Sequence, residues 1–338
     1  MSNIVSKEIH LISRPEGEPR KENFLLVEKE INSINEGEVL VKNLWMSVDP
    51  YMRGRMNDSK SYAAPVKIGQ PMTGETVGTV IESKSDIYNV GDKLCIHKGW
   101  QTLIKAKDTD PSIYKVPDSN IPLSSYLGAV GMPGRTAYFG LNRVGKPKEN
   151  DIVVVSAASG AVGSIVGQLA KLQGCNVIGI AGGSEKTTYV KDELNFNDCI
   201  DYKSDNFIEL LSEACKDGID IYFENVGGMV SRSVAKHLNY NSRVPICGFI
   251  SQYNEDDVLN SDTPFKIFGS LDTKPEHRFF VVTEWMDEWT KATEELSRHI
   301  VEGKINYKET ITKGFVNSPQ ALRDVLTCKN FGKQIIDI

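Results

Sequence analysis

The stretch Asp151–Gly174, DIVVVSAASGAVGSIVGQLAKLQG, decides the fold of this chain. It opens with the continuous apolar run Ile152–Val155, which is typical of a parallel strand buried on both faces. A turn of small residues, Ala158–Gly163, follows. The next segment predicts a helix that ends at Gly174. Its apolar residues recur on one stripe: Val162, Ile165, Val166, Leu169 and Leu172. This order of strand, glycine turn and helix is the unit that holds a dinucleotide pyrophosphate.

The turn departs from the usual G-x-G-x-x-G pattern, because Ala158 stands where the first glycine is expected. Glycines also serve in plain turns, so this motif alone is weak. Here the buried strand before it and the amphipathic helix after it supply the context that the motif requires. The segment therefore predicts dinucleotide binding rather than a bare structural turn.

Length and composition set wide bounds on the class of protein. The 338 residues are enough for two domains or one large domain. An apolar content of 40% and a charged content of 25% are ordinary for a soluble globular protein. The net charge of −6 argues against nonspecific binding to nucleic acid or to anionic membranes. No apolar run is long enough to span a bilayer, and the N-terminus lacks the apolar core of a signal peptide. We therefore expect a cytoplasmic protein.

The order of expected elements predicts two domains. Residues 1–125 are rich in β-branched runs such as Val39–Val48 and Thr73–Ile81, which indicates a twisted β-barrel or roll. From residue 126 onward, six apolar strands alternate with helical segments, as in an open doubly wound sheet. These strands are Ile152–Val155, Asn176–Ile180, Cys199–Asp201, Ile219–Phe223, Arg243–Cys247 and Phe279–Val282. The tail is predicted to be strand, helix, strand. We therefore expect a first domain of residues 1–125, completed by residues 305–338, and a second domain of residues 126–304.

Two further segments carry structural expectations. Glu284–Glu302 predicts one amphipathic helix, with Trp285 and Trp289 packed into a core. Asn254–Asp272 is polar and contains Pro264, which favours a long mobile loop. Loops of that length are usually either functional lids or disordered.

The end of the second doubly wound strand indicates which nicotinamide cofactor is used. An NAD site usually has an acidic residue there, about 20 residues beyond the glycine turn. Here the positions are Ala181 and Gly182, so no negative charge repels a 2′-phosphate. Lys186 follows a few residues later and can supply a positive partner. We therefore predict NADP(H).

No metal site is predicted. A catalytic zinc needs three protein ligands, usually cysteine and histidine, and an open position. The six cysteines are scattered and include no C-x-x-C pair, which also excludes a disulfide framework. None of the five histidines stands at ligand spacing from a cysteine except in the short stretch Cys95-Ile96-His97. A substrate oxygen would then be polarised by hydroxyl donors, of which tyrosine is the natural choice.

Jointly, several stretches resemble one family. They are Ser47–Arg53 (SVDPYMR), Gly131–Gly140 (GMPGRTAYFG), Ala157–Gly163 (AASGAVG), Tyr222–Gly228 (YFENVGG), Cys247–Asn254 (CGFISQYN), Phe280–Val282 (FVV) and Asn330–Lys333 (NFGK). The chain resembles the zinc-independent medium-chain dehydrogenases/reductases of the prostaglandin reductase, 2-alkenal double-bond reductase and bacterial curcumin reductase type. The resemblance covers nearly the whole chain. It implies a Rossmann NADP-binding domain, a GroES-like barrel domain and a homodimer acting on a small molecule.

The resemblance also implies roles for individual residues. Cofactor contacts are carried over to Gly160, Ala161, Val162, Gly163, Lys186, Tyr202, Asn225, Cys247, Gly248, Ile250, Tyr253, Phe280, Val281, Val282 and Asn330. Lys186 and Tyr202 match residues near the 2′-phosphate. Tyr253 and Tyr51 are the catalytic candidates, the first matching a tyrosine near the substrate carbonyl and the second one lining the substrate side. The implied reaction is NADPH-dependent reduction of the C=C bond of an α,β-unsaturated aldehyde or ketone.

Two features depart from the family pattern, and three alternative functions compete with this one. Arg135 replaces a usually apolar residue, which would alter the cleft or reach solvent, and the loop after Tyr253 is unusually acidic. The alternatives are a quinone reductase on the same scaffold, an NADPH-binding protein without turnover, and a zinc alcohol dehydrogenase. The missing zinc ligands exclude the third. The two tyrosines and the nicotinamide-side residues argue against the second.

Overall fold

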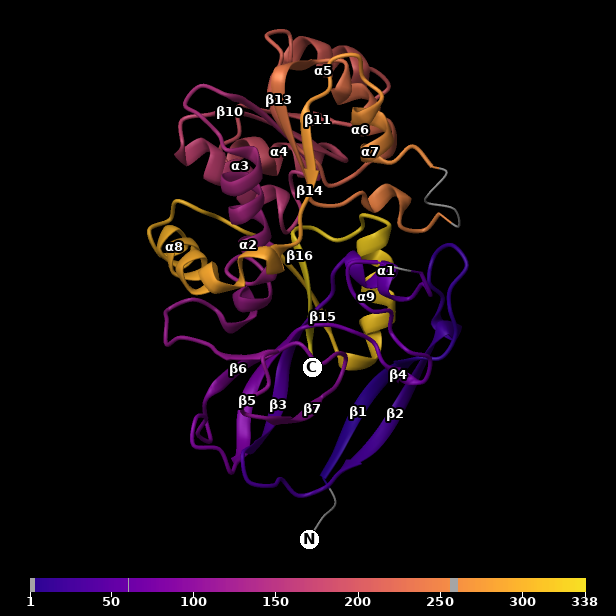
Figure 1. The fold of residues 1–338 in the computed structure, drawn as a ribbon, viewed down its shortest axis with the longest axis vertical. Helices are drawn as coiled ribbons and strands as arrows, with labels where there is room; N and C mark the ends of the chain where they lie inside the picture. Colours follow the sequence, from indigo (N-terminus) through magenta and orange to yellow (C-terminus); the bar gives the residue numbers. More distant parts are fainter. Residues whose placement is uncertain (1–3, 60, 256–260) are drawn as a thin grey trace. The chain divides into compact units, whose positions relative to one another are not determined.

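The structure is a computed structural model that describes residues 4–59, 61–255 and 261–338. The chain divides into two compact units (Figure 1). The first contains the chain up to Gly128 together with Glu309–Ile338, and the second contains Ala129–Lys308. Each unit has sheets of its own.

The first unit is built mainly of antiparallel strands. Its small sheet has the order β2-β1-β4, and its large one the order β15-β16-β3-β5-β6-β8, with β7 also paired to β3. The strands are β1 (Ile4–Leu11), β2 (Phe24–Ile31), β3 (Glu38–Ser47), β4 (Gln70–Pro71), β5 (Thr76–Ser83), β6 (Lys93–Ile96), β7 (Leu103–Lys107), β8 (Ile113–Lys115), β15 (Glu309–Lys313) and β16 (Lys333–Asp337). Apolar residues of alternating strand positions, including Val39, Val41 and Leu94, form its core.

Strand β3 connects the two ends of the first unit. It pairs with β5 on one side. On its other side, residues 38–42 pair with β7 and residues 45–47 pair with β16. The C-terminal tail therefore pairs with the first unit, and helix α9 (Ser318–Leu326) lies between its two strands in the sequence. The short helix α1 (Tyr51–Arg55) follows β3 directly and carries Tyr51.

The second unit is a doubly wound parallel sheet, which confirms the predicted fold class. Its strand order is β11-β10-β9-β12-β13-β14, and every pair in it is parallel. The strands are β9 (Ile152–Ser156), β10 (Asn176–Ala181), β11 (Asp198–Asp201), β12 (Ile219–Phe223), β13 (Leu238–Ile246) and β14 (Glu276–Phe279). The valines of β9 have no exposed surface, as expected for a central strand covered on both faces.

Helices connect and cover these strands. They are α2 (Met132–Phe139), α3 (Gly163–Leu172), α4 (Ser184–Thr188), α5 (Phe207–Ala214), α6 (Gly228–Ala235), α7 (Pro264–Gly269) and α8 (Trp289–Val301). Shorter helical turns are η1 (Lys21–Asn23), η2 (Leu123–Leu127), η3 (Gly140–Gly145), η4 (Tyr189–Glu193), η5 (Ile250–Gln252), η6 (Val282–Glu288) and η7 (Phe315–Asn317). Helix α3 buries Ile165, Val166 and Leu169 but leaves Leu172 exposed, so the predicted stripe is one residue too long.

The predicted helix over Glu284–Glu302 is wrong at its start. The 3-10 turn η6 precedes α8, and Trp285 within this turn has non-helical backbone angles. The Trp285 ring stacks on Phe139 with 5.3 Å between ring centroids, and Trp289 Nε1 donates to the carbonyl of Val282 at 3.1 Å. Packing of the two indoles breaks the helix there.

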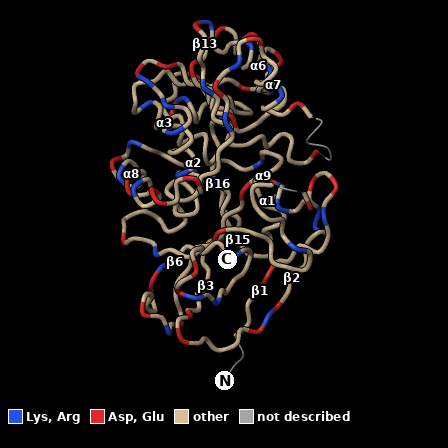
Figure 2. The backbone as a smooth tube through the Cα atoms, viewed as in Figure 1, with Lys and Arg blue, Asp and Glu red and all other residues tan. Residues whose placement is uncertain are grey.

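Exposed charges of both signs follow one another along α8 (Figure 2).

Two other sequence expectations also need correction. The last strand, predicted as Phe279–Val282, is β14 and ends at Phe279, so residues 280–282 lead into a helical turn. Within the predicted loop Asn254–Asp272, α7 begins at Pro264, and the Thr263 hydroxyl caps it by accepting from the Lys266 N–H. Phe268 of this helix is fully buried, which explains why the segment folds. Residues 256–260 of that loop lie outside the described residues.

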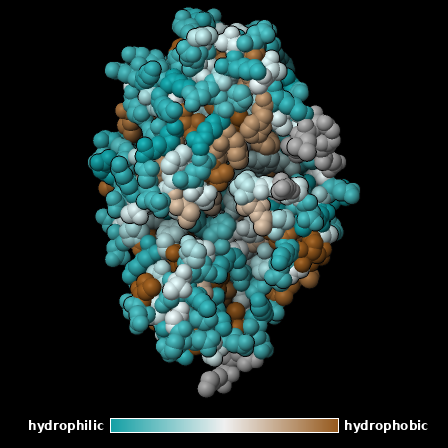
Figure 3. All heavy atoms as spheres, in the orientation of Figure 1, coloured by the Kyte–Doolittle hydropathy of each residue, from teal (hydrophilic) through white to brown (hydrophobic). Residues whose placement is uncertain are grey.

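The surface is polar, as the ordinary apolar and charged content of the sequence leads us to expect. The face drawn in Figure 3 is mostly hydrophilic, with apolar side chains in small patches. Across residues 4–59, 61–255 and 261–338, no helix is both long and apolar enough to cross a bilayer.

Candidate functional site

The turn after β9 has the geometry of a phosphate-binding turn. Ala157 has a positive φ of 50°, and its carbonyl oxygen accepts from the Gly160 N–H at 2.9 Å. A Cβ at Gly163 would lie 2.4 Å from that same oxygen, so no larger residue fits there. Helix α3 then begins at Gly163, so the positive end of its dipole lies at the turn. That positive end suits an anion.

Ala158 does not damage this turn, because β10 makes room for its methyl group. Ala158 is fully buried, and its N–H donates to the carbonyl of Ile180 at 3.0 Å. The neighbour on β10 is Gly179, where an added Cβ would lie 2.8 Å from the Ala158 Cβ. The glycine that the motif lacks is thus replaced by an alanine that packs against a glycine on the next strand.

The end of β10 fits a 2′-phosphorylated adenosine. Gly182 lies against the Tyr202 ring, since a Cβ at Gly182 would come within 2.7 Å of it. The nearest acid on the neighbouring strand, Asp201, is occupied by the backbone: its Oδ1 accepts from the N–H groups of Gly183 and Lys203, both at 2.9 Å. Lys186 lies half-buried in α4, one turn further on. The residues present therefore fit NADP(H).

The remaining predicted cofactor residues of the second unit follow the carboxyl ends of three further strands. Asn225 follows β12, Cys247–Ile250 follow β13, and Phe280–Val282 follow β14. Since all six strands are parallel, these segments share one edge of the sheet with the glycine turn. Burial raises the pKa of the Cys247 thiol to about 12, with the charge of Glu224 adding to the effect. That thiol stays protonated and is no nucleophile.

Tyr253 lies over the segment that follows β13. Its hydroxyl oxygen accepts from the N–H of Phe249 at 3.4 Å, and a Cβ at Gly248 would lie 2.6 Å from it. The Phe249 and Tyr253 rings meet edge to face, 5.4 Å apart. Tyr253 therefore packs on the segment after β13, and its role near the substrate stays a prediction.

Tyr51 belongs to the first unit, where it begins α1. Its hydroxyl is buried and has no hydrogen-bond partner among the described residues. Its ring lies 6.5 Å from that of His97, and the Arg55 guanidinium carbon lies 5.9 Å from its centroid. Burial holds the pKa of Tyr51 well above its usual 10, and Asp49 and Glu75 add to the effect. The group is therefore a neutral donor at any physiological pH.

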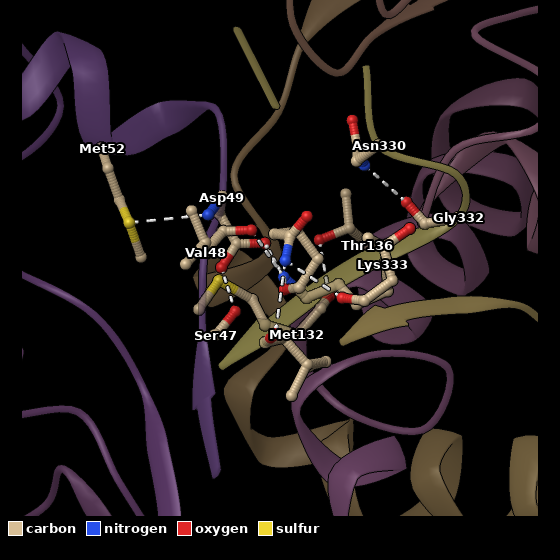
Figure 4. Close-up of polar contacts among 12 residues, drawn as sticks. Ser47, Val48, Asp49, Met52, Met132, Thr136, Asn330, Gly332 and Lys333 are labelled. Atoms are coloured by element: carbon tan, nitrogen blue, oxygen red, sulfur yellow. Dashed lines mark hydrogen bonds and ion pairs between the residues drawn. The ribbon is translucent and has the colours of Figure 1, made fainter. Parts of the chain in front are cut away.

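A buried ion pair holds the segment that leads to Tyr51 (Figure 4). Lys333 Nζ donates to Asp49 Oδ1 at 2.9 Å, to the Val48 carbonyl at 2.8 Å and to the Gln334 carbonyl at 3.0 Å. Asp49 also accepts from the Ser47 hydroxyl. In the same tail, Asn330 Nδ2 donates to the Gly332 carbonyl at 2.9 Å. The two matched stretches SVDPYMR and NFGK are thus packed together within the first unit.

Arg135 does not reach solvent, so that part of the expectation is wrong. The side chain is 2% exposed. Its Nε donates to the Thr293 hydroxyl at 2.9 Å, and its guanidinium carbon lies 4.7 Å from the centroid of the Trp289 ring. Thr293 in turn donates to the Val130 carbonyl. Arg135 joins α2 to α8, because a planar guanidinium can stack on an indole while it donates.

The sequence reasoning missed three polar residues beside the predicted site. Glu224, Asp49 and Lys333 all lie within stretches that were matched to the family, yet they received no role. A charged residue in an otherwise buried stretch is the signal that would have found them, because an ionisable group is rarely buried without a partner. Among the described residues, no cluster of three or more histidine, cysteine, aspartate or glutamate side chains could hold a metal ion.

Comparisons with known proteins agree with this geometry. Residues 7–113 match the family described as the N-terminal domain of oxidoreductase, and residues 161–297 match the family described as zinc-binding dehydrogenase. The chain is 41% identical to the NADPH-dependent curcumin reductase of Escherichia coli (strain K12) over 331 residues, which are 97% of this chain and 95% of the relative. It is 36% identical to the 2-alkenal reductase (NADP(+)-dependent) of Nicotiana tabacum over 338 residues, 98% of this chain and 97% of the relative.

A solved structure gives the same result. The crystal structure of CurA in complex with NADPH from Vibrio vulnificus superposes with a TM-score of 0.92 at 41% sequence identity, covering 98% of each chain. The chain belongs to the family of medium-chain dehydrogenases/reductases that includes the curcumin, prostaglandin and 2-alkenal reductases. The predicted family and enzyme class are therefore confirmed: the protein is an oxidoreductase.

Proposed function

We propose that this enzyme uses NADPH to reduce the C=C bond of α,β-unsaturated aldehydes and ketones. The observation that carries the proposal is the match over nearly the whole chain to a 2-alkenal reductase and a curcumin reductase. Both relatives are named as reductases with NADP(H), and a 2-alkenal is an α,β-unsaturated aldehyde. The uncharged end of β10 and the turn closed by Gly163 support the same cofactor.

NADP(H) is the cofactor, and we name here the residues that would hold it. The pyrophosphate would be held by Gly160, Ala161, Val162 and Gly163, and the 2′-phosphate by Lys186 and Tyr202. Further contacts would come from Asn225, Cys247, Gly248, Ile250, Tyr253, Phe280, Val281, Val282 and Asn330. When bound, NADPH supplies a hydride.

The residues of this chain would act on the oxygen of the substrate. The β-carbon gains the hydride, the C=C electron pair moves onto the carbonyl oxygen as an enolate, and the α-carbon then takes a proton from water. A neutral hydroxyl that donates to this oxygen stabilises the charge that develops on it. Tyr253 and Tyr51 are the candidate donors, and the raised pKa of Tyr51 keeps its proton in place.

An assay with three substrate classes tests the proposal. Purified protein and NADPH would be given a trans-2-alkenal, an aryl enone or a quinone, and the loss of reduced-nicotinamide absorbance would be followed. The expected product of the first two is the saturated carbonyl compound. An allylic alcohol with its double bond intact would contradict C=C reduction. Turnover of the quinone alone would favour a quinone reductase.

A homodimer is part of the same proposal. The six-stranded sheet has two open edges, β11 and β14, and unpaired strand edges are sites where a second chain can add. Light scattering coupled to size-exclusion chromatography measures the mass directly. A single species of 37.5 kDa would contradict the dimer.

A further inference from the structure

A buried carboxyl group lies directly beyond the end of β12, next to the predicted cofactor residue Asn225. It belongs to Glu224, whose side chain has no exposed surface. The proposed mechanism does not use this group. Placing a carboxyl group in a protein interior is unfavourable unless its oxygens are hydrogen-bonded, so its contacts explain why it is there.

The contacts of this carboxyl group fold the turn after β12 around it. Glu224 Oε1 accepts from the N–H groups of Val226 at 2.7 Å and Gly227 at 3.0 Å, and from the Tyr222 hydroxyl at 3.0 Å. Its other oxygen, Oε2, accepts from the hydroxyl of Ser231 on α6. No lysine or arginine within the described parts of the chain pairs with it. The carboxyl group is therefore held by uncharged donors only, and two of these donors are N–H groups of the turn itself.

The backbone of Glu224 connects this turn to the segment after β13. Its carbonyl oxygen accepts from the N–H groups of Cys247 at 2.9 Å and Gly248 at 3.2 Å. Its own N–H donates to the Pro245 carbonyl at 3.0 Å. The start of the Cys247–Tyr253 segment, which leads to Tyr253, is thus set by the position of Glu224.

Ser156, the last residue of β9, belongs to the same network. Its hydroxyl oxygen accepts from the Asn225 N–H at 2.9 Å and lies 3.3 Å from Glu224 Oε1, within reach to donate. Its carbonyl oxygen accepts from Asn225 Nδ2 at 2.7 Å. Three neighbouring strands, β9, β12 and β13, therefore meet at Glu224 just where each one gives way to a predicted cofactor segment.

We propose that Glu224 is a positioning residue for NADP(H), which holds the Asn225–Gly228 turn and the start of the Cys247–Tyr253 segment in the conformation that receives the nicotinamide half. This inference rests on the proposed use of NADPH. The adenosine end belongs to β10 and β11, on the far side of β9 from Glu224. Glu224 should therefore matter for the whole dinucleotide but not for its 2′-phosphorylated adenosine end.

Binding of two ligands to three variants tests this. Dissociation constants for NADPH and for adenosine 2′,5′-bisphosphate would be measured by titration calorimetry for the wild type, Glu224→Ala, Glu224→Gln and the control Glu213→Ala on the exposed face of α5. Glu224→Ala removes both acceptors and should weaken NADPH about tenfold or more, while the fragment binds within about twofold of wild type. Glu224→Gln keeps one acceptor oxygen for the turn and should bind NADPH nearly as the wild type does.

Each outcome decides the inference. A folded Glu224→Ala variant with unchanged NADPH binding overturns it, and so does an equal loss for NADPH and for the fragment, which would mean general loosening. Should Glu224→Ala fail to fold, Ser231→Ala is used instead, since it removes only the donor to Glu224 Oε2. It is expected to weaken NADPH binding by a smaller factor, about threefold. Unchanged NADPH binding in this variant again overturns the inference. A wild type that binds no NADPH would overturn the proposed function as well.

Discussion

Lys333 Nζ lies 2.9 Å from Asp49 Oδ1, and both side chains are buried, 4% and 11% exposed. The pair joins the last strand of the chain to the segment between β3 and α1, two residues before Tyr51. With three acceptors around its ammonium group, Lys333 has each of its three hydrogens satisfied. A buried pair of this kind contributes little net stability against an apolar pair, but breaking it leaves one charge stranded.

Lys333→Met should therefore destabilise the first unit by about 3–5 kcal/mol, because Asp49 stays buried without its cation. Urea denaturation measures the loss. The matched control is Lys329→Met, whose pair with Asp324 is exposed and 4.0 Å long, and which should cost less than about 1 kcal/mol. Equal effects of the two substitutions would contradict the importance of the buried pair.

The contact between Ala158 and Gly179 predicts a specific coupling. Gly179→Ala places a Cβ 2.8 Å from the Ala158 Cβ, and should destabilise the second unit by about 1–3 kcal/mol. Ala158→Gly in the same chain should return part of that loss. The return is incomplete because the new Cβ also meets Val190 at 2.9 Å and Cys199 at 3.0 Å. A double-mutant cycle from denaturation midpoints measures the coupling; strict additivity would show that the two residues do not compensate.

Cofactor preference should depend on Lys186. Lys186→Ala is expected to raise KM for NADPH about tenfold or more, because a charged partner of the 2′-phosphate is lost. KM for NADH should change little, since NADH lacks that phosphate. Lys191→Ala is the control, because Lys191 is exposed and pairs with Asp198 at 2.9 Å. If the NADPH-to-NADH ratio of KM values stayed the same, Lys186 would have no part in cofactor choice.

The charge state of Glu224 predicts a pH effect on stability. Burial raises the pKa of Glu224 above its usual 4.5, although hydrogen bonds from Ser231, Gly227, Val226 and Tyr222 offset part of the shift. A carboxyl group whose pKa is higher in the folded state contributes stability below pH 4.5 and loses it as the pH rises through the folded pKa. Its titratable neighbours, Tyr222 and Cys247, both have pKa values raised well above neutrality and do not change charge in that range.

Glu224→Gln should remove this pH dependence, because an amide stays neutral. The fall in Tm between pH 5 and pH 8 should be smaller for the variant than for the wild type, by about 2–4 °C for each kcal/mol of charge burial removed. Scanning calorimetry at the two pH values makes the comparison. A larger fall in the variant would contradict the raised pKa.

The sequence predicted what depends on local pattern and failed where distant side chains meet. The strand, turn and helix from Ile152 to Leu172 follow from apolar periodicity within 21 neighbouring residues, and the structure has them. The helix break at Trp285 depends on a ring of α2, and the burial of Arg135 depends on Thr293 and Trp289 of α8. Such contacts leave no periodic signal, so the predictions at those positions were wrong.

The same limit applies to the candidate site. Most residues matched to the family came from short continuous stretches. The polar contacts behind them join residues far apart, such as Asp49 and Lys333, which are separated by 284 positions. A single sequence marks such residues only as charges in unexpected places, and their partners become visible only when the strands are assembled.

Replacement of the two tyrosines by phenylalanine separates catalysis from folding. The Tyr51 hydroxyl is buried without a partner among the described residues, so Tyr51→Phe should leave stability unchanged or raise it by about 1 kcal/mol. If that hydroxyl donates to the substrate oxygen, kcat should nevertheless fall by about two orders of magnitude. If the Tyr51 hydroxyl serves catalysis rather than folding, the variant should be both less active and at least as stable as the wild type.

Tyr253→Phe loses the long hydrogen bond from the Phe249 N–H, at 3.4 Å, and should fold normally. Its kcat should fall by a similar factor while NADPH affinity stays within about threefold, because the ring still packs on Phe249 and Gly248. Steady-state kinetics on a trans-2-alkenal, with NADPH binding measured separately, distinguishes the two residues. Full activity in either variant removes that tyrosine from the mechanism, and full activity in the double variant would leave the enolate to be stabilised by other donors.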